Sequence, residues 1–222
     1  MTDTALSLLF PVFPDYTLEH LANLSIGERD ALIFKLHQKT FGKILSGFAK
    51  CPKCEEHLEF QMSTSDFLDN HAQNTNRSFK YKNIELFFRP VTGRDLLETQ
   101  CLDDLNDARL ALIDRTVTGV FQNGESITIT DLPNEALQIL SENLSQSDPL
   151  ADIMLDLNCP ACGETWECLL DIVSFLFHEI AAEAKRLLNE VHILAEAYGW
   201  KEKEILALSP GRRLFYMEVA GS

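Results

Sequence analysis

The chain has 222 residues, 45% of them hydrophobic, and its 34 acidic and 19 basic side chains leave a formal net charge of −15. A chain of this length forms one large domain or two small ones and needs no disulfides to fold. It has no apolar run near 18 residues, which argues against a membrane-spanning helix. Nucleic-acid binding requires Lys and Arg to neutralise phosphates, so the acidic balance instead favours a basic protein partner.

The first 46 residues are predicted to be mainly helical. Residues 1–16 are apolar and contain two prolines, so we expect an extended or docking segment there rather than a helix. A short helix is predicted at 17–24. The sequence Ser25-Ile-Gly-Glu28 then has the spacing of a capping box, and it should open a longer helix that runs to about Phe41.

Two C-x-x-C pairs, Cys51/Cys54 and Cys159/Cys162, are the most specific motif of the chain. Four thiols in this arrangement are the usual ligand set of one structural, tetrahedral zinc ion. The usual gap between such pairs is about 15 to 20 residues, which is much shorter than the gap here. Loop closure costs only about 0.6 kcal/mol more per doubling of length, whereas structural zinc binding supplies about 10 to 16 kcal/mol. The long gap is therefore compatible with one shared site.

An internal repeat supports a shared site. Residues 51–68 and 159–176 are identical at seven of 18 aligned positions. Each copy is predicted to form a turn, a strand and the start of a helix, and two such knuckles facing each other make a zinc ribbon. Gly163 provides the positive φ that this turn needs, but Glu55 occupies the same place in the first copy, where a residue with a side chain costs about 1 kcal/mol.

Three other interpretations of the cysteines remain open. A thioredoxin-like C-x-x-C motif lies between a strand and a helix, whereas extended residues are expected on both sides here. Structural disulfides need an oxidising compartment, and residues 1–10 lack the basic start of a signal peptide, so we expect a cytosolic protein. Alternatively, the four thiols pack without a metal. Cys101 and Cys168 are expected to be core residues rather than ligands.

Residues 69–150 are predicted to form an inserted α+β segment. It begins with a polar, turn-rich linker at 69–78 and continues with a hairpin at 79–88. Thr92-Gly-Arg-Asp95 should cap one helix, and further helices are expected at about 103–115 and from Leu132-Pro133 to about Ser145. Asn123-Gly124 indicates a tight turn between them.

The longest predicted element is a helix at 173–198, whose apolar residues recur at steps of three and four. This apolar seam is expected to pack either on helices of the same chain or on another subunit. Gly199 should end the helix, and two short helices are expected at 200–208 and 210–219. The seam consists of Leu176, Ile180, Ala184, Leu187, Val191, Leu194 and Tyr198.

The predicted fold class is therefore α+β and mainly helical, with a discontinuous four-Cys zinc ribbon made of two β-knuckles. Four regions are expected: an N-terminal helical segment at 1–46, the ribbon at 47–68 and 151–172, the α/β insert at 69–150, and a C-terminal helical segment at 173–222. The sequence contains no glycine-rich phosphate loop, nucleophile elbow or His-Glu-x-x-His motif, and its six His residues are scattered. Because a Cys-only zinc has no open coordination position, we predict that the protein is not an enzyme.

The second half of the chain resembles a known family. The matching residues are Cys159-Pro-Ala-Cys-Gly163 with Trp166 and Phe175-Leu176, then Arg186-Leu-Leu188, Glu190-Val-His192, Ala197-Tyr-Gly-Trp200 and Glu204 to Pro210 with Arg212-Arg213. This pattern resembles the T4-like phage baseplate hub assembly family, whose members also accompany contractile injection systems and phage tail-like particles. The resemblance extends over about residues 28–219.

The resemblance implies a non-enzymatic assembly factor, a chaperone or a minor structural component of the hub of a contractile-tail baseplate. Its partners would be hub, spike or tube proteins, and neither a membrane nor a small-molecule substrate is implied. Only the four cysteines of the zinc site, Cys51, Cys54, Cys159 and Cys162, have family counterparts as functional residues. The alternative functions are a nucleic-acid-binding zinc ribbon and a thiol-disulfide enzyme.

Overall fold

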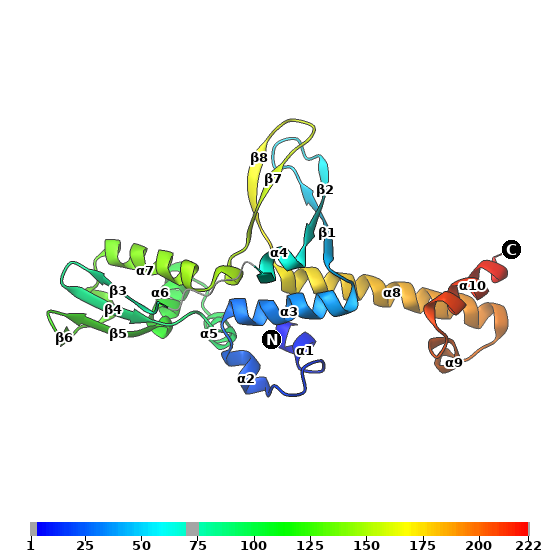
Figure 1. Cartoon of the computed structure of the whole chain (residues 1–222), viewed down its shortest axis with the longest axis horizontal. Coiled ribbons are helices and arrows are strands. Elements are labelled where there is room, and N and C mark those ends of the chain that lie inside the picture. Colours follow the sequence, from blue (N-terminus) through cyan, green and yellow to red (C-terminus); the bar gives the residue numbers. More distant parts are fainter. Residues whose placement is uncertain (1–3, 70–75, 222) are drawn as a thin grey trace. The chain divides into compact units, whose positions relative to one another are not determined.

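The computed structural model describes residues 4–69 and 76–221 (Figure 1). Helices predominate and are combined with small antiparallel sheets, in agreement with the predicted mixture of helix and strand. The chain divides into two compact units, residues 1–173 and 174–222. Most of the linker predicted at 69–78 lies outside the described residues. Along the described part of the chain, no helix combines the length and the apolar character needed to cross a membrane.

The first described residues form a helix, so the prediction that residues 1–16 are not helical was wrong for residues 4–9. Helix α1 spans Thr4–Leu9, and its Ala5 and Leu9 are fully buried. Both prolines come after Leu9, so they limit where the helix ends without interrupting its hydrogen bonds. Packing against α3 provides the stability that so short a helix lacks in isolation.

Helices α2 and α3 follow the predicted pattern. Helix α2 covers Leu18–Asn23, and α3 covers Ile26–Thr40. The predicted capping box is confirmed: the Glu28 backbone N–H donates to Ser25 Oγ at 3.2 Å, and the Ser25 N–H donates to a Glu28 carboxylate oxygen at 2.9 Å. Ile33 and Phe34 of α3 are completely buried and form part of the core.

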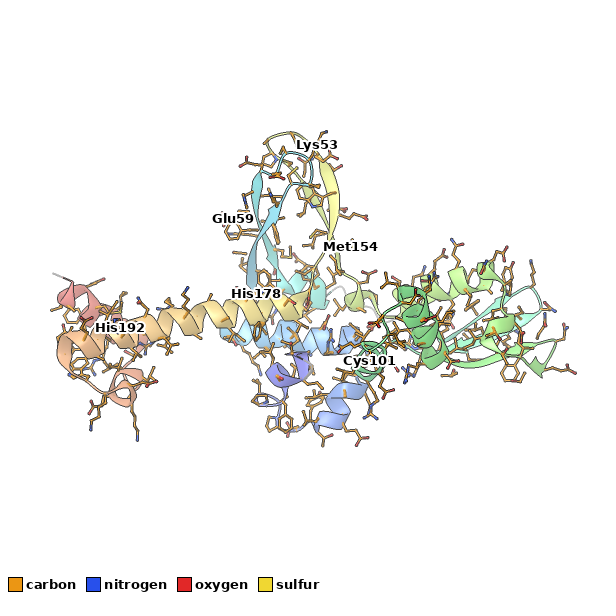
Figure 2. The ribbon with its side chains drawn as sticks, turned by 180° about the vertical axis from the view of Figure 1, so that it is seen from behind. Lys53, Glu59, Cys101, Met154, His178 and His192 are labelled. Atoms are coloured by element: carbon orange, nitrogen blue, oxygen red, sulfur yellow. The ribbon has the colours of Figure 1, made fainter. Side chains whose placement is uncertain are left out.

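Two β-hairpins carry the cysteine pairs at their turns. Strands β1 (Ile44–Lys50) and β2 (His57–Ser63) form the first, and strands β7 (Met154–Asn158) and β8 (Thr165–Leu169) form the second. Each hairpin is a separate two-stranded antiparallel sheet. They lie side by side in both views of the molecule (Figures 1 and 2).

Both copies of the sequence repeat continue into a helix. Helix α4 (Thr64–Asp69) begins directly after β2, and α8 (Ile172–Tyr198) begins at the position that corresponds to Thr64 in the repeat. The first side chain of each helix, Thr64 and Ile172, is fully buried. The predicted order of turn, strand and helix is thus present in both copies.

The inserted segment forms a four-stranded antiparallel sheet with strand order β3-β4-β5-β6 and with helices on one face. Its buried core combines Leu86 and Val120 of the sheet with Ile113, Ala136 and Leu140 of the helices. The strands are β3 (Ser78–Tyr81), β4 (Ile84–Phe88), β5 (Val117–Gln122) and β6 (Glu125–Ser126). The helices on the sheet are α6 (Leu105–Thr116) and α7 (Asn134–Ser147), whereas α5 (Gly93–Thr99) packs against α2 and α6. Short 3-10 turns lie at Ile129–Asp131 and Pro149–Ala151.

The predicted hairpin and turn of this segment are confirmed, but Cys101 is not a core residue. Lys82, Asn123 and Gly124 adopt φ values of 54°, 53° and 88°, as the tight turns require. Cys101 is exposed because α5 ends at Thr99, so the helix does not carry this side chain toward the core.

Two points of the inserted segment bind the start of α3. The Ile26 backbone N–H donates to the carbonyl of Val91, between β4 and α5, at 3.0 Å. Near the end of the segment, the Gly27 N–H donates to Asp148 Oδ2 at 2.9 Å. A Cβ atom at Gly27 would lie 2.0 Å from Asp148 Oδ1, so only glycine permits this approach. These contacts return the chain to the point where the second hairpin begins.

The second unit is a helical assembly of α8 beyond residue 173, α9 (Glu202–Leu206) and α10 (Pro210–Ala220). Arg213 is buried, where its Nε donates to Glu190 Oε2 at 2.7 Å and its Nη1 to the Leu208 carbonyl at 2.7 Å. The Tyr198 hydroxyl donates to the Tyr216 carbonyl at 3.0 Å. At its C-terminal end, the apolar seam of α8 therefore packs on α10 of the same chain. Packing on the same chain was one of the two predicted alternatives.

Candidate metal centre

The two cysteine-bearing turns have the same backbone geometry. In the first, the Cys51 N–H donates to the Glu56 carbonyl at 2.9 Å, and the Glu55 N–H donates to the Cys51 carbonyl at 3.0 Å. In the second, Cys159 and Gly163 form the equivalent bonds, with distances of 2.8 and 2.9 Å. Glu55 has φ = 63° and Gly163 has φ = 72°, so the predicted left-handed position is confirmed in both turns. The repeat in the sequence is thus a repeat in structure.

The turns bring the four predicted cysteines together. Cys51 Sγ lies 3.7 Å from Cys162 Sγ, and Cys54 Sγ lies 3.5 Å from Cys159 Sγ. All four sulfur atoms lie within 4.8 Å of one another. A disulfide would need a separation of about 2.05 Å. By contrast, a tetrahedral zinc ion with Zn–S bonds of about 2.3 Å places its sulfur ligands about 3.8 Å apart. These four side chains could therefore hold one metal ion.

Each pair contributes one buried and one exposed cysteine. Cys51 and Cys159 are only 1% exposed, whereas Cys54 and Cys162 face solvent. Burial tends to raise the pKa of the Cys51 thiol, but the backbone N–H groups of Cys54 and Lys53 point at the sulfur and outweigh it, leaving a pKa of about 7. The Cys51 thiol therefore loses its proton more readily than an ordinary cysteine does.

The two exposed thiols, Cys54 and Cys162, both have a raised pKa when no cation is present. The Glu56 backbone N–H tends to lower the pKa of Cys54, but the neighbouring Cys162 and Cys159 thiols raise it to about 12. A second and third negative charge in so small a cluster would repel the first. A divalent cation removes this conflict, because metal binding releases the thiol protons and compensates the thiolate charges.

An ion pair also joins the two turns. Lys53 Nζ, at the tip of the first hairpin, donates to Glu164 Oε2 of the second at 2.8 Å, and Figure 2 shows Lys53 at this tip. The pair is largely exposed, so it adds little stability by itself. The repeat does not indicate this ion pair, because Lys53 aligns with Ala161 in the second copy.

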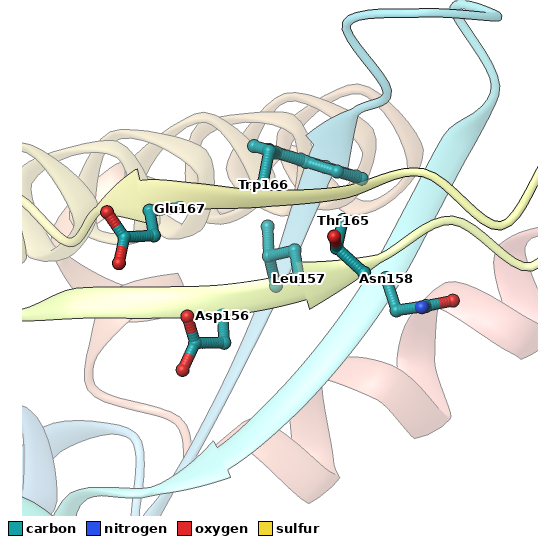
Figure 3. A pocket seen from close by; sticks show the side chains of 6 residues that line it. All are labelled: Asp156, Leu157, Asn158, Thr165, Trp166 and Glu167. Atoms are coloured by element: carbon teal, nitrogen blue, oxygen red, sulfur yellow. The ribbon is translucent and has the colours of Figure 1, made fainter.

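A pocket of about 240 Å³ lies on the second hairpin (Figure 3). It is lined by Leu157 and Trp166 together with Asp156 and Glu167, which stand directly opposite each other on β7 and β8. Their carboxylates point the same way in Figure 3. Because both carboxylates lie on this face of the hairpin, the face is acidic. Like charges directly opposite each other on paired strands also repel.

The structure separates the four cysteines from the other candidate residues. Cys168 is half-buried on β8 and does not join the cluster. His192 is exposed on α8 and lies 3.7 Å from the carboxylate of Glu196. With four sulfur ligands, a tetrahedral metal ion has no open position for water or substrate. Such a centre can crosslink the two hairpins but cannot activate a nucleophile.

The fold is thus that of a mixed helix and strand protein whose two matching hairpins present four converging cysteines. The family model for the T4 bacteriophage base plate protein matches residues 5–178. The matched range includes the N-terminal helices, both hairpins, the inserted segment and the first turns of α8. The chain belongs to this family, as its resemblance to baseplate proteins had indicated. No curated protein and no solved structure matches the chain.

Proposed function

We propose that the protein is a non-enzymatic assembly factor or minor structural component of the baseplate hub of a contractile tail or injection system. Membership of the baseplate family supports a role with other baseplate components. The four converging cysteines support a structural metal, which we propose to be one zinc ion held by Cys51, Cys54, Cys159 and Cys162 as a zinc ribbon.

The proposed mechanism is mechanical rather than chemical. Zinc would fix the tips of two hairpins that are far apart in the sequence, and would thereby stop them from separating. The rigid pair of hairpins would then hold the inserted segment and α3 ready for contact with hub, spike or tube proteins. The protein would do this in the cytoplasm of the cell in which the particle is built, whether or not it stays in the finished particle.

Zinc content and particle assembly test this proposal together. The native chain should contain one zinc ion per molecule, measured by elemental analysis of the purified protein. The Cys51→Ser/Cys159→Ser variant removes one buried ligand from each hairpin, so it should lose the metal, expose both tips to hydrogen exchange and fail to support assembly of infectious or contractile particles. Cys101→Ser is the matched control, because Cys101 is exposed and outside the cluster.

Two results would contradict the proposed metal-dependent mechanism. One is a double variant that still supports assembly at the level of the native chain. The other is a native chain that carries no metal when it is purified without chelators under reducing conditions, because the cluster would then be a group of packed thiols. If particles remained intact after the gene for this chain was deleted, the proposed baseplate role would be wrong.

A further inference from the structure

An apolar groove runs between two helices of the inserted segment. Helices α6 and α7 cover the same face of the sheet, since Ile113 of α6 and Leu140 of α7 share one core with the strands. Toward solvent, a groove of about 350 Å³ stays open between them. Most of its lining is apolar, including Ala108, Leu112 and Leu144. The two helices therefore leave an uncovered apolar channel above the core.

The mouth of this groove exposes a leucine side chain. Leu105, the first residue of α6, lines the groove and is 87% exposed. A large apolar side chain left in water beside a concave apolar surface is typical of a protein contact site, whereas a single exposed leucine on a polar surface is not. Leu105 and the apolar lining of the groove thus form one apolar surface.

Arg109 is the one charged residue among those that line the groove. It follows Leu105 by one helical turn and precedes Leu112 by another, so all three side chains share a stripe of α6. Within residues 4–69 and 76–221 it forms no ion pair, whereas Arg115 of the same helix pairs with Glu98. A guanidinium beside an apolar floor is well suited to bind a carboxylate that arrives with apolar neighbours.

We propose that this groove binds an amphipathic helix of another baseplate protein, with apolar side chains in the channel and an Asp or Glu paired with Arg109. The inference rests on the proposed function, because it takes the partner to be a baseplate component. The lining residues of α6 extend from Leu105 to Thr116, which corresponds to about 16 Å of helix. A bound helix of about three turns fits this length and would present side chains at i, i+4 and i+7.

Site-specific photo-cross-linking in particle-producing cells tests the groove in the full chain. The probe is Leu105→p-benzoylphenylalanine, which is tolerated because Leu105 is nearly fully exposed. It should form an adduct with another protein, and peptide mapping should place the adduct in a helical segment that carries a carboxylate within about one turn of the attached residue. Adding Arg109→Glu should reduce the yield at least tenfold, whereas the matched control Arg212→Glu, an exposed arginine on α10, should leave it unchanged.

Other outcomes overturn the proposal. These are no adduct, an adduct with a second copy of this chain or with a small molecule, an adduct in a segment without a carboxylate, and a yield that Arg109→Glu does not change. Leu188→p-benzoylphenylalanine, on α8 and 62% exposed, is the positional control and should give no adduct of the same kind.

An assembly assay separates this inference from the proposed function. If the groove is the contact site, Leu105→Glu should reduce particle yield at least tenfold while the zinc content stays at one ion per chain. If Leu105→Glu assembles normally while the Cys51→Ser/Cys159→Ser variant does not, the groove proposal fails and the proposed function stands. If particles form without the chain at all, both fail.

Discussion

Glu55 adopts a conformation that glycine adopts in the second hairpin. Its φ of 63° is costly for a residue with a Cβ, and its exposed ion pair with Lys50 compensates little of that cost. Glu55→Gly should therefore raise the free energy of unfolding of the first hairpin by about 1 kcal/mol. Hydrogen exchange of the metal-loaded chain at β1 and β2 measures this change.

The reciprocal substitution provides the control. Gly163→Ala should lower the free energy of unfolding of the second hairpin by about 1 kcal/mol, because Gly163 has φ = 72°. The added Cβ would meet no neighbouring atom, so the change would report the backbone strain alone. If Glu55→Gly destabilised the first hairpin, the Lys50 contact would have to be worth more than the backbone strain.

At this scale, the cysteines and the strained turn could be predicted from the sequence because both depend on local spacing. The ion pair between Lys53 and Glu164 could not, since it depends on how two distant turns face each other. The exposure of Cys101 was mispredicted for a similar reason. Its burial depended on where α5 ends, and helix ends are weakly encoded by apolar periodicity.

Helix α5 begins with a buried carboxylate that caps it. Asp95 accepts two hydrogen bonds from Arg89, at 2.7 and 2.9 Å, and one from the Thr92 backbone N–H at 2.9 Å. Burial alone would raise the pKa of Asp95, but the Arg89 and Thr92 bonds lower it to about 2. The charged form is thus bound more strongly in the folded chain than in the unfolded one. This contribution is present above about pH 4 and is lost as the pH falls toward 2.

Asp95→Asn should consequently lower the free energy of unfolding of the inserted segment by about 2 kcal/mol at pH 7. Its difference from the native chain should shrink as the pH falls below 4. Urea titrations at several pH values, read by hydrogen exchange in α5, give this difference. Glu98→Gln, an exposed change on the same helix, should have little effect at any of these pH values. A difference that stays constant with pH would mean that the carboxylate charge is not what stabilises the cap.

Among the elements, those with strong local signals were predicted well. The capping boxes at Ser25 and Thr92 and the long apolar periodicity of α8 placed three helices close to their observed bounds. Helix α1 was missed because two prolines outweighed its apolar residues, although both follow its last residue. The attachment of the inserted segment to α3 could not be predicted from hydrophobic periodicity, because it depends on two hydrogen bonds donated by the backbone of Ile26 and Gly27 to distant residues.

Across the whole molecule, charge is distributed unevenly between the two units. Residues 1–173 carry 27 acidic and 13 basic side chains, whereas residues 174–222 carry seven and six. The second unit is therefore almost neutral, and nearly all the acidic character belongs to the unit with the cysteine cluster. Long-range attraction of basic partners should accordingly act on the first unit and weaken with salt.

Removing the buried ion pair of the second unit should destabilise that unit without affecting the first. Arg213→Ala leaves Glu190 buried without its main partner, which typically costs about 3 to 5 kcal/mol. We expect faster hydrogen exchange in α9 and α10, with unchanged exchange in both hairpins and unchanged metal content. The neighbouring Arg212→Ala should change stability by less than about 0.5 kcal/mol. If Arg213→Ala also released the metal, the two units would unfold as one.

The distance in sequence between the two cysteine pairs has a consequence during synthesis. Chains grow at about 5 to 20 residues per second, so roughly 5 to 20 s pass between the appearance of Cys51 and that of Cys159. Throughout that interval only two of the four sulfur atoms of the cluster have been synthesised. A chain released before Cys159 has been added can form the first hairpin but not the four-sulfur cluster. Only chains that extend through Cys162 can therefore offer all four sulfurs to one metal ion.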